Sequence, residues 1–125
     1  MIQMQTKLKV IDNSGAKIVK CIKILKGFKK KKAKIGDVIV VSVQKIKSNS
    51  SLSKVKKGEV CYAMIIRTKK KFKRNTGVTT SFENNSVVLL TNTEIPLFTR
   101  VFGKVPRELR TQKMLKLYSL SMGTF

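Results

Sequence analysis

Short segments of alternating or β-branched residues, separated by turn residues, most strongly constrain the fold of this 125-residue chain. Residues 1–10 alternate apolar and polar side chains, which predicts a half-buried strand. Further strands are expected at residues 16–25, 37–43, 60–68 and 86–91, where β-branched residues concentrate. Strands this short, at a spacing of roughly 8–15 residues, favour an all-β fold with a small barrel over a βαβ fold.

Turn residues divide these strands. The run from Asp12 to Gly15 is expected to form a tight turn, because Asx side chains can accept hydrogen bonds from the following backbone and glycine tolerates positive φ. Residues 69–82 predict a projecting hairpin with its tip at Asn75-Thr76-Gly77. The segment 37–43 is apolar on both faces, which predicts the most central strand. Residues 47–57 are rich in Ser and Lys and predict an exposed loop.

Helical signals occur only near the C-terminus. Pro106 suits the first turn of a short helix that runs to Arg110. Thr111 can cap a second short helix, whose apolar side would comprise Met114, Leu115, Leu117 and Tyr118. Because neither helix is long enough to be stable alone, both are expected to dock on the barrel. The chain is thus expected to form one domain over residues 1–125, with a helical C-terminal segment at about 105–120.

The composition excludes several classes of function. The chain has 28 Lys and Arg against 6 Asp and Glu, with no His, for a net charge of +22. Proton-transfer catalysis usually uses His or paired carboxylates, and the acids here are scattered, so no enzymatic activity, cofactor or metal is expected. The longest apolar run, Val38 to Val41, is far shorter than the ~20 residues that span a bilayer, so no membrane role is expected. Electrostatic repulsion among this many positive charges instead indicates a polyanionic partner such as nucleic acid.

Both cysteines, Cys21 and Cys61, lie within apolar stretches and lack the further ligands of a zinc site. We expect reduced, buried, structural thiols, with a redox or disulfide role as the alternative.

The basic residues gather in three clusters, at residues 26–34, 54–57 and 69–74. Any one lysine run is ordinarily a solvated loop, but here there are too few acids to neutralise the runs internally. Phe28 and Phe72 lie within or beside these runs, where an aromatic ring can pack against sugar or base. The candidate RNA-binding residues are Lys7, Lys9, Lys17, Lys20, Lys23, Lys26, Lys29, Lys30, Lys31, Lys32, Lys34, Lys54, Lys56, Lys57, Arg67, Lys69, Lys70, Lys71, Lys73 and Arg74.

Motifs along most of the chain share one order and nearly one spacing with a known family. They lie at residues 1–6, 12–17, 21–23, 36–40, 54–60, 67–70, 99–103 and 107–110. Together they resemble the universal large-subunit ribosomal protein family L-fourteen, over residues 1 to about 120. The chain departs from the family pattern at Met64, Thr76 and Phe98, and in its last five residues.

The resemblance implies a five-stranded β-barrel with a projecting hairpin and short C-terminal helices. It also implies a structural constituent of the large ribosomal subunit that binds large-subunit rRNA at the intersubunit face, near the sarcin-ricin loop. Ribosomal proteins L-three and L-nineteen would be its neighbours, and small-subunit rRNA would be contacted through a bridge. A ribosome silencing factor is a further partner that the resemblance implies. The bridge or factor surface would comprise Thr99, Arg100, Arg107, Arg110 and Lys116.

Three alternatives remain open at this level. Arg100 would instead form a surface ion pair if Glu94 or Glu108 lay beside it. A freestanding RNA chaperone of OB-like type would require a platform of surface aromatic residues. Lysine-heavy usage, with only five arginines, is typical of an AT-rich genome and indicates an organelle-encoded protein of the mitochondrial ribosome, with a plastid or a low-GC bacterial cytoplasm as the alternative.

Overall fold

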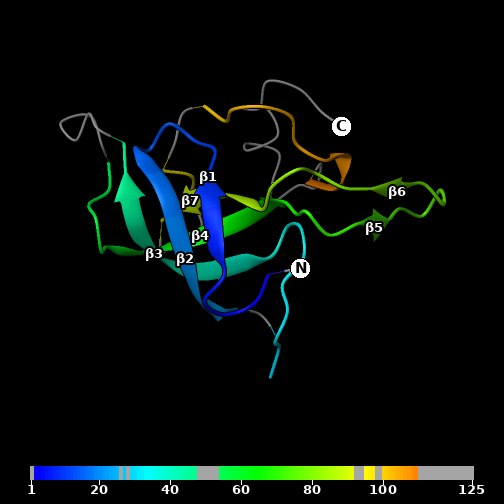
Figure 1. Cartoon of the computed structure of the whole chain (residues 1–125), viewed down its shortest axis with the longest axis horizontal. Helices are drawn as coiled ribbons and strands as arrows, with labels where there is room; N and C mark the ends of the chain where they lie inside the picture. Colours follow the sequence, from blue (N-terminus) through cyan, green and yellow to red (C-terminus); the bar gives the residue numbers. More distant parts are fainter. Residues whose placement is uncertain are drawn as a thin grey trace.

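Five strands close into a barrel in the computed structural model of the chain, which describes residues 2–25, 27, 29–47, 54–91, 95–97 and 100–109 (Figure 1). Neighbouring strands are antiparallel except β1 and β7, which are parallel and close the barrel. The predicted all-β, five-stranded barrel is confirmed. Its strands, in spatial order, are β1 (Lys7–Val10), β2 (Ala16–Ile24), β3 (Val38–Ile46), β4 (Val60–Arg67) and β7 (Ser86–Leu90).

Strand alternation fills the barrel interior with apolar side chains. In β1, Leu8 and Val10 are buried, whereas Lys7 and Lys9 are exposed. Inward residues of all five strands join one core cluster, which also takes in Ile2 and Val55 from outside the strands. This interior holds the barrel surface in a fixed shape beneath the basic side chains.

A second core cluster covers the outer face of β4 and β7. Val88 and Leu90 pack there with Val101, Val105 and Leu109 from the C-terminal part of the described chain. Every residue of β7 is therefore buried. The expectation that residues 37–43 form the most central strand was wrong: a closed barrel has no central strand, and Val40 and Ser42 of β3 are partly exposed.

The N-terminal strand is shorter than its alternation predicts. Gln5 has a positive φ of 68°, and the Thr6 N–H donates to the Gln3 carbonyl at 3.2 Å, so residues 3–6 form a turn. Met4 is 63% exposed as a result. Ile2 still reaches the core by bridging to Ala33.

The predicted hairpin is present and projects from the barrel (Figure 1). It consists of β5 (Phe72–Lys73) and β6 (Thr79–Thr80), which pair antiparallel. At its tip the Arg74 N–H donates to the Val78 carbonyl at 2.9 Å.

Helical structure within the described residues is one 3-10 turn, η2 (Arg107–Leu109). The Leu109 N–H donates to the Pro106 carbonyl at 3.2 Å, and the Leu109 side chain is buried in the second core cluster. The described part of the first predicted C-terminal helix is thus a single 3-10 turn, and its Leu109 anchors it in the core. The second, expected from Thr111 through Tyr118, lies outside the described residues. No helix in the described part of the chain is long and apolar enough to cross a membrane.

A buried carboxylate joins the turn after β1 to β7. Asp12 Oδ1 accepts hydrogen bonds from the N–H and the hydroxyl of Ser14, and Oδ2 accepts one from the Leu89 N–H at 2.8 Å. Gly15 completes the turn at φ 103°, so the predicted turn is confirmed. Burial raises the pKa of Asp12, and the three hydrogen bonds act against that rise. Asp12 thereby connects the turn after β1 to strand β7.

Replacing Asp12 by Ala should lower the free energy of unfolding by about 3 kcal/mol, because two backbone N–H groups and a hydroxyl lose their acceptor at a buried site. Urea unfolding followed by circular dichroism measures this loss. The control Glu83→Ala, at an exposed acid, should stay within about 0.5 kcal/mol of wild type. A loss below about 1 kcal/mol for Asp12→Ala would show that closure does not need the carboxylate.

Candidate nucleic-acid interface

Three acidic side chains make hydrogen bonds or ion pairs within the protein that reduce their capacity to neutralise the exposed lysines. Asp12 is fully buried. Asp37 Oδ2 accepts hydrogen bonds from Lys30 Nζ and from the Lys34 N–H, each at 2.8 Å. Glu108 pairs with Arg74. With 28 basic residues against 6 acids in the chain, the surface stays strongly positive.

Most of the candidate RNA-binding residues are exposed. Lys20, Lys30, Arg67 and Arg74 are partly buried. Lys26, Phe28, Thr99, Arg110 and Lys116 lie outside the described residues. The exposed candidates are Lys7, Lys9, Lys17, Lys23, Lys29, Lys31, Lys32, Lys34, Lys54, Lys56, Lys57, Lys69, Lys70, Lys71 and Lys73.

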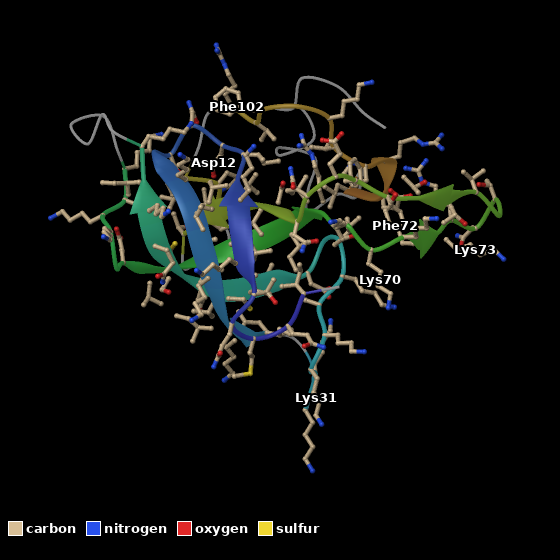
Figure 2. The ribbon with its side chains drawn as sticks, viewed as in Figure 1. Asp12, Lys31, Lys70, Phe72, Lys73 and Phe102 are labelled. Atoms are coloured by element: carbon tan, nitrogen blue, oxygen red, sulfur yellow. The ribbon has the colours of Figure 1, made fainter. Side chains whose placement is uncertain are left out.

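The hairpin and the loop before β3 bring two of the three clusters together. Lys34 and Ile35 line a hollow of about 370 Å³ together with Lys70, Phe72 and Lys73. Figure 2 shows Phe72 at the base of the hairpin, with Lys70 beside it and Lys73 farther toward the tip. Lys31 extends away from the barrel below this region. Lysines that are about 40 residues apart in sequence thus share one edge of the molecule.

The lysines of β1 and β2 continue this surface across the barrel. Lys7 lies directly opposite Lys20 in the β1–β2 register, an arrangement of like charges that destabilises a sheet unless an external anion neutralises it. Lys9 and Lys17 line a second hollow, also of about 370 Å³, with Lys69 of the hairpin base. The hairpin cluster therefore joins the strand lysines at Lys69.

A third hollow, of about 870 Å³, extends the surface to the end of the barrel. Lys9 and Lys17 line it too, together with Lys47 and Phe102. Lys47 Nζ lies 5.1 Å from the centroid of the Phe102 ring, a cation–π contact. Sequence reasoning missed Lys47 and Phe102, because 55 residues separate them and neither belongs to a basic cluster.

We name the surface around these three hollows the basic face. It comprises Lys7, Lys9, Lys17, Lys34, Lys47, Lys69, Lys70, Lys71 and Lys73.

The cluster at residues 54–57 lies on the side of the barrel away from the hairpin (Figure 1), next to the Lys47 end of the basic face: the Lys54 N–H donates to the Ser14 carbonyl and the Lys47 N–H to the Gly15 carbonyl, each at 2.8 Å. The expected exposed loop is anchored there, because Val55 is only 3% exposed and joins the core. Lys54 Nζ donates to the Leu97 carbonyl at 2.9 Å, whereas Lys56 and Lys57 are exposed. These two side chains form a second, smaller basic site.

Arg67 holds the end of the large hollow in shape. Its Nε donates to the Lys104 carbonyl at 2.8 Å, and its Nη2 donates to the Phe102 carbonyl at 2.7 Å. Burial lowers the pKa of this guanidinium. Arg67 thus positions the segment that carries Phe102, with two of its donors engaged by the protein itself.

Arg74 has a comparable role at the hairpin. Its side chain is 11% exposed and pairs with Glu108 of η2, and its Cζ lies 5.9 Å from the Phe72 ring centroid. The ion pair fastens the hairpin to the 3-10 turn.

Cys21 and Cys61 are not joined by a disulfide bond. Both thiols are free and buried, as expected for structural cysteines. Burial, aided by the nearby charges of Glu59 and Asp12, raises the pKa of Cys61 to about 11. Within the ranges that the structure describes, no three His, Cys, Asp or Glu side chains are grouped to hold a metal ion.

A closed barrel whose outer surface carries many exposed lysines and a projecting basic hairpin is typical of a structural RNA-binding protein, in which positive charge contacts the phosphate backbone. The family described as Ribosomal protein L14p/L23e matches residues 1–125. The chain belongs to this family and is a non-enzymatic structural protein of the large ribosomal subunit that binds large-subunit rRNA.

Cys61 should be nearly inert toward a thiol-specific reagent in the folded protein. A pKa of about 11, against an ordinary 9.0, lowers the thiolate fraction at pH 8 by about 100-fold, and burial slows the reaction further. The measurement compares alkylation rates of Cys21→Ser, in which only Cys61 reacts, in buffer and in urea. Equal rates in the two conditions would refute the buried, protonated state.

Proposed function

We propose that the basic face is the surface through which this ribosomal protein contacts rRNA. The observation that carries the proposal is that Lys9 and Lys17 line two of its three hollows, and Lys69 joins them to the hairpin. Contiguous lysines on a rigid barrel release counterions from the RNA without an ordering cost in the protein backbone. Because lysine is a mobile point charge, this contact follows the shape and phosphate positions of the RNA more than its sequence.

The remaining candidates serve the same partner at its periphery. Lys29, Lys31 and Lys32 extend the face beyond the barrel, and Lys56 with Lys57 contacts a separate rRNA segment on the far side. The mechanism is charge neutralisation and scaffolding, and it involves no reaction.

Replacing Lys70, Lys71 and Lys73 by Gln should weaken binding to a short RNA duplex and reduce incorporation into large subunits in competition with wild type. If about eight phosphates are neutralised, log affinity falls with log salt at a slope near −7, and the triple variant should reduce its magnitude by about 2 to 3. Fluorescence anisotropy over a salt series gives both slopes.

The matched control removes the same charge from the far side, as Lys54, Lys56 and Lys57→Gln. A short duplex held at the hairpin end of the basic face does not reach that cluster, so its slope should change by less than about 1. Equal losses in the two variants would show that total charge matters and the face does not.

We further propose that Thr99, Arg100, Arg107, Arg110 and Lys116 contribute to an intersubunit bridge or factor-binding surface. The support is family resemblance, together with the exposure of Arg100 and Arg107. Glu108, one of the two acids considered as partners of Arg100, pairs with Arg74 instead. In this proposal the protein lies at the intersubunit face near the sarcin-ricin loop, beside L-three and L-nineteen, and contacts small-subunit rRNA or a silencing factor.

Arg100→Glu should yield large subunits that contain the protein but join small subunits poorly, because the reversed charge repels bridge phosphates. Sucrose-gradient analysis of purified variant subunits mixed with wild-type small subunits measures joining. Lys45→Glu makes the same charge change at an exposed position outside the proposed bridge surface and should join normally. Normal joining by Arg100→Glu would remove Arg100 from the bridge.

The ribosome in question is proposed to be mitochondrial, with the gene in the organelle. Lysine-rich, arginine-poor usage supports this assignment. Locating the gene in a plastid or bacterial genome would overturn it.

A further inference from the structure

The hollow at the hairpin base has the features of a binding pocket as well as of a charged surface. It measures about 370 Å³, within the range of roughly 300–1,000 Å³ that is typical of small-ligand pockets. Three segments meet around it: Lys34 and Ile35 before β3, residues 68–73 at the hairpin base, and Glu108 of η2. Apolar Ile35 and aromatic Phe72 lie among lysines, a combination that suits a ligand with a flat apolar part and an anionic part.

Phe72 presents a ring to this hollow. It also lines a neighbouring hollow of about 420 Å³, which Arg74 lines as well, whereas Arg74 does not line the first. Phe72 thus lies at the boundary of the two hollows, together with Lys73 and Glu108, and the Arg74 guanidinium is 5.9 Å from its ring centroid. A ring backed by a cation in this way is a ready surface on which a nucleobase can stack.

The pocket is held in shape before any ligand arrives. The Arg74–Glu108 ion pair fixes the hairpin to η2, and η2 is anchored by buried Leu109. At the hairpin base, the Lys69 N–H donates to Asn85 Oδ1 at 2.8 Å, and the Phe82 N–H donates to the Thr68 carbonyl at 3.1 Å. Such preorganisation reduces the ordering cost of binding.

Glu108 gives the pocket a chemical preference. A carboxylate has about four acceptor sites. Arg74 Nε lies 2.5 Å from Oε1, but Arg74 Nη2 lies 3.5 Å from Oε2, so Oε2 keeps acceptor capacity toward a ligand. The Watson–Crick edge of guanine carries two adjacent donors, N1–H and the N2 amino group, whereas that of uracil carries one donor between two carbonyls. The negative charge of Glu108 also directs phosphates away from the pocket interior and toward the lysine rim.

We propose that this pocket binds one unpaired guanosine of an RNA, with the base stacked on Phe72, its donor edge on Glu108 and its phosphates on Lys34, Lys70 and Lys71. The proposal rests on the RNA-binding function proposed above and adds a nucleotide-specific contact to a surface that otherwise contacts only the backbone. Base stacking on an aromatic side chain is worth about 1–3 kcal/mol, which corresponds to roughly 5- to 150-fold in affinity.

The test uses the full chain and RNA hairpins that differ at one loop position, which carries guanosine, uridine or an abasic residue. Wild type should bind the guanosine hairpin at least about 5-fold more tightly than the abasic one, with uridine between them. Phe72→Leu should abolish this discrimination and leave the affinity for the abasic hairpin and its salt slope unchanged. Phe72→Tyr should retain the discrimination. The control Phe102→Leu removes an exposed aromatic residue from another hollow of the basic face, and it should keep the wild-type ratio of guanosine to abasic affinity even if overall affinity falls.

Nuclear magnetic resonance of protein labelled at Phe provides a second measurement that needs no variant with altered binding. The Phe72 ring protons should shift on addition of the guanosine hairpin and stay in place with the abasic hairpin. Salt-dependent binding of all hairpins with equal affinity, or undiminished discrimination by Phe72→Leu, would overturn the nucleotide pocket while the proposed RNA-binding face stood. Absence of salt-dependent binding to any hairpin would overturn both.

Discussion

Closure of the barrel by the parallel pairing of β1 with β7 is the interaction on which the rest of the structure depends. It joins segments almost 80 residues apart, so its loop-closure cost must be met by contacts made at the seam. There the Lys9 and Ile11 N–H groups donate to the carbonyls of Asn85 and Val87, and Asp12 continues the ladder by accepting the Leu89 N–H. Because Asn85 also accepts the Lys69 N–H, the seam fixes the base of the hairpin as well.

Acidic and basic side chains have different roles in this fold. Asp12 secures the seam, Asp37 secures the loop before β3, and Glu108 secures the hairpin through Arg74. These three acidic side chains thus bind the protein's own backbone and basic side chains, while most lysines lie exposed on the outer surface. The like-charge repulsion that destabilises this protein therefore arises among lysines at the surface, where a bound polyanion can neutralise it. The packing of the interior is unaffected by it.

The local sequence pattern was sufficient to predict strands in which apolar and polar residues alternate. It was also sufficient to predict the turn formed by Asx and glycine residues. It failed where a distant segment decides the outcome. Residues 3–6 alternate like a strand, but the chain turns there, with Gln5 at positive φ and its N–H donating to the carbonyl of Cys21 in β2. The two-sided burial of β7 depends on residues 101–109, and Val55 is a core residue inside a sequence that looks like a loop. At the site, the density of lysines in the sequence predicted the hairpin and the loop before β3. The contact between Lys47 and Phe102 could not be predicted in this way, because it forms at the end of the barrel, where β1, β2 and residues 101–104 meet.

The contact between Arg67 and Gly103 restricts how this part of the protein can evolve. Gly103 has φ 80°, and a Cβ placed on it would lie 2.1 Å from Arg67 Nη2. Any other residue at position 103 therefore meets backbone strain, and the Arg67 guanidinium must move away from the Phe102 and Lys104 carbonyls to make room. A shorter side chain at position 67 would relieve the clash but would leave the carbonyls of Phe102 and Lys104 without their donors. A change at one position therefore alters the contacts of the other, so in related chains we expect the two to be retained together or replaced together.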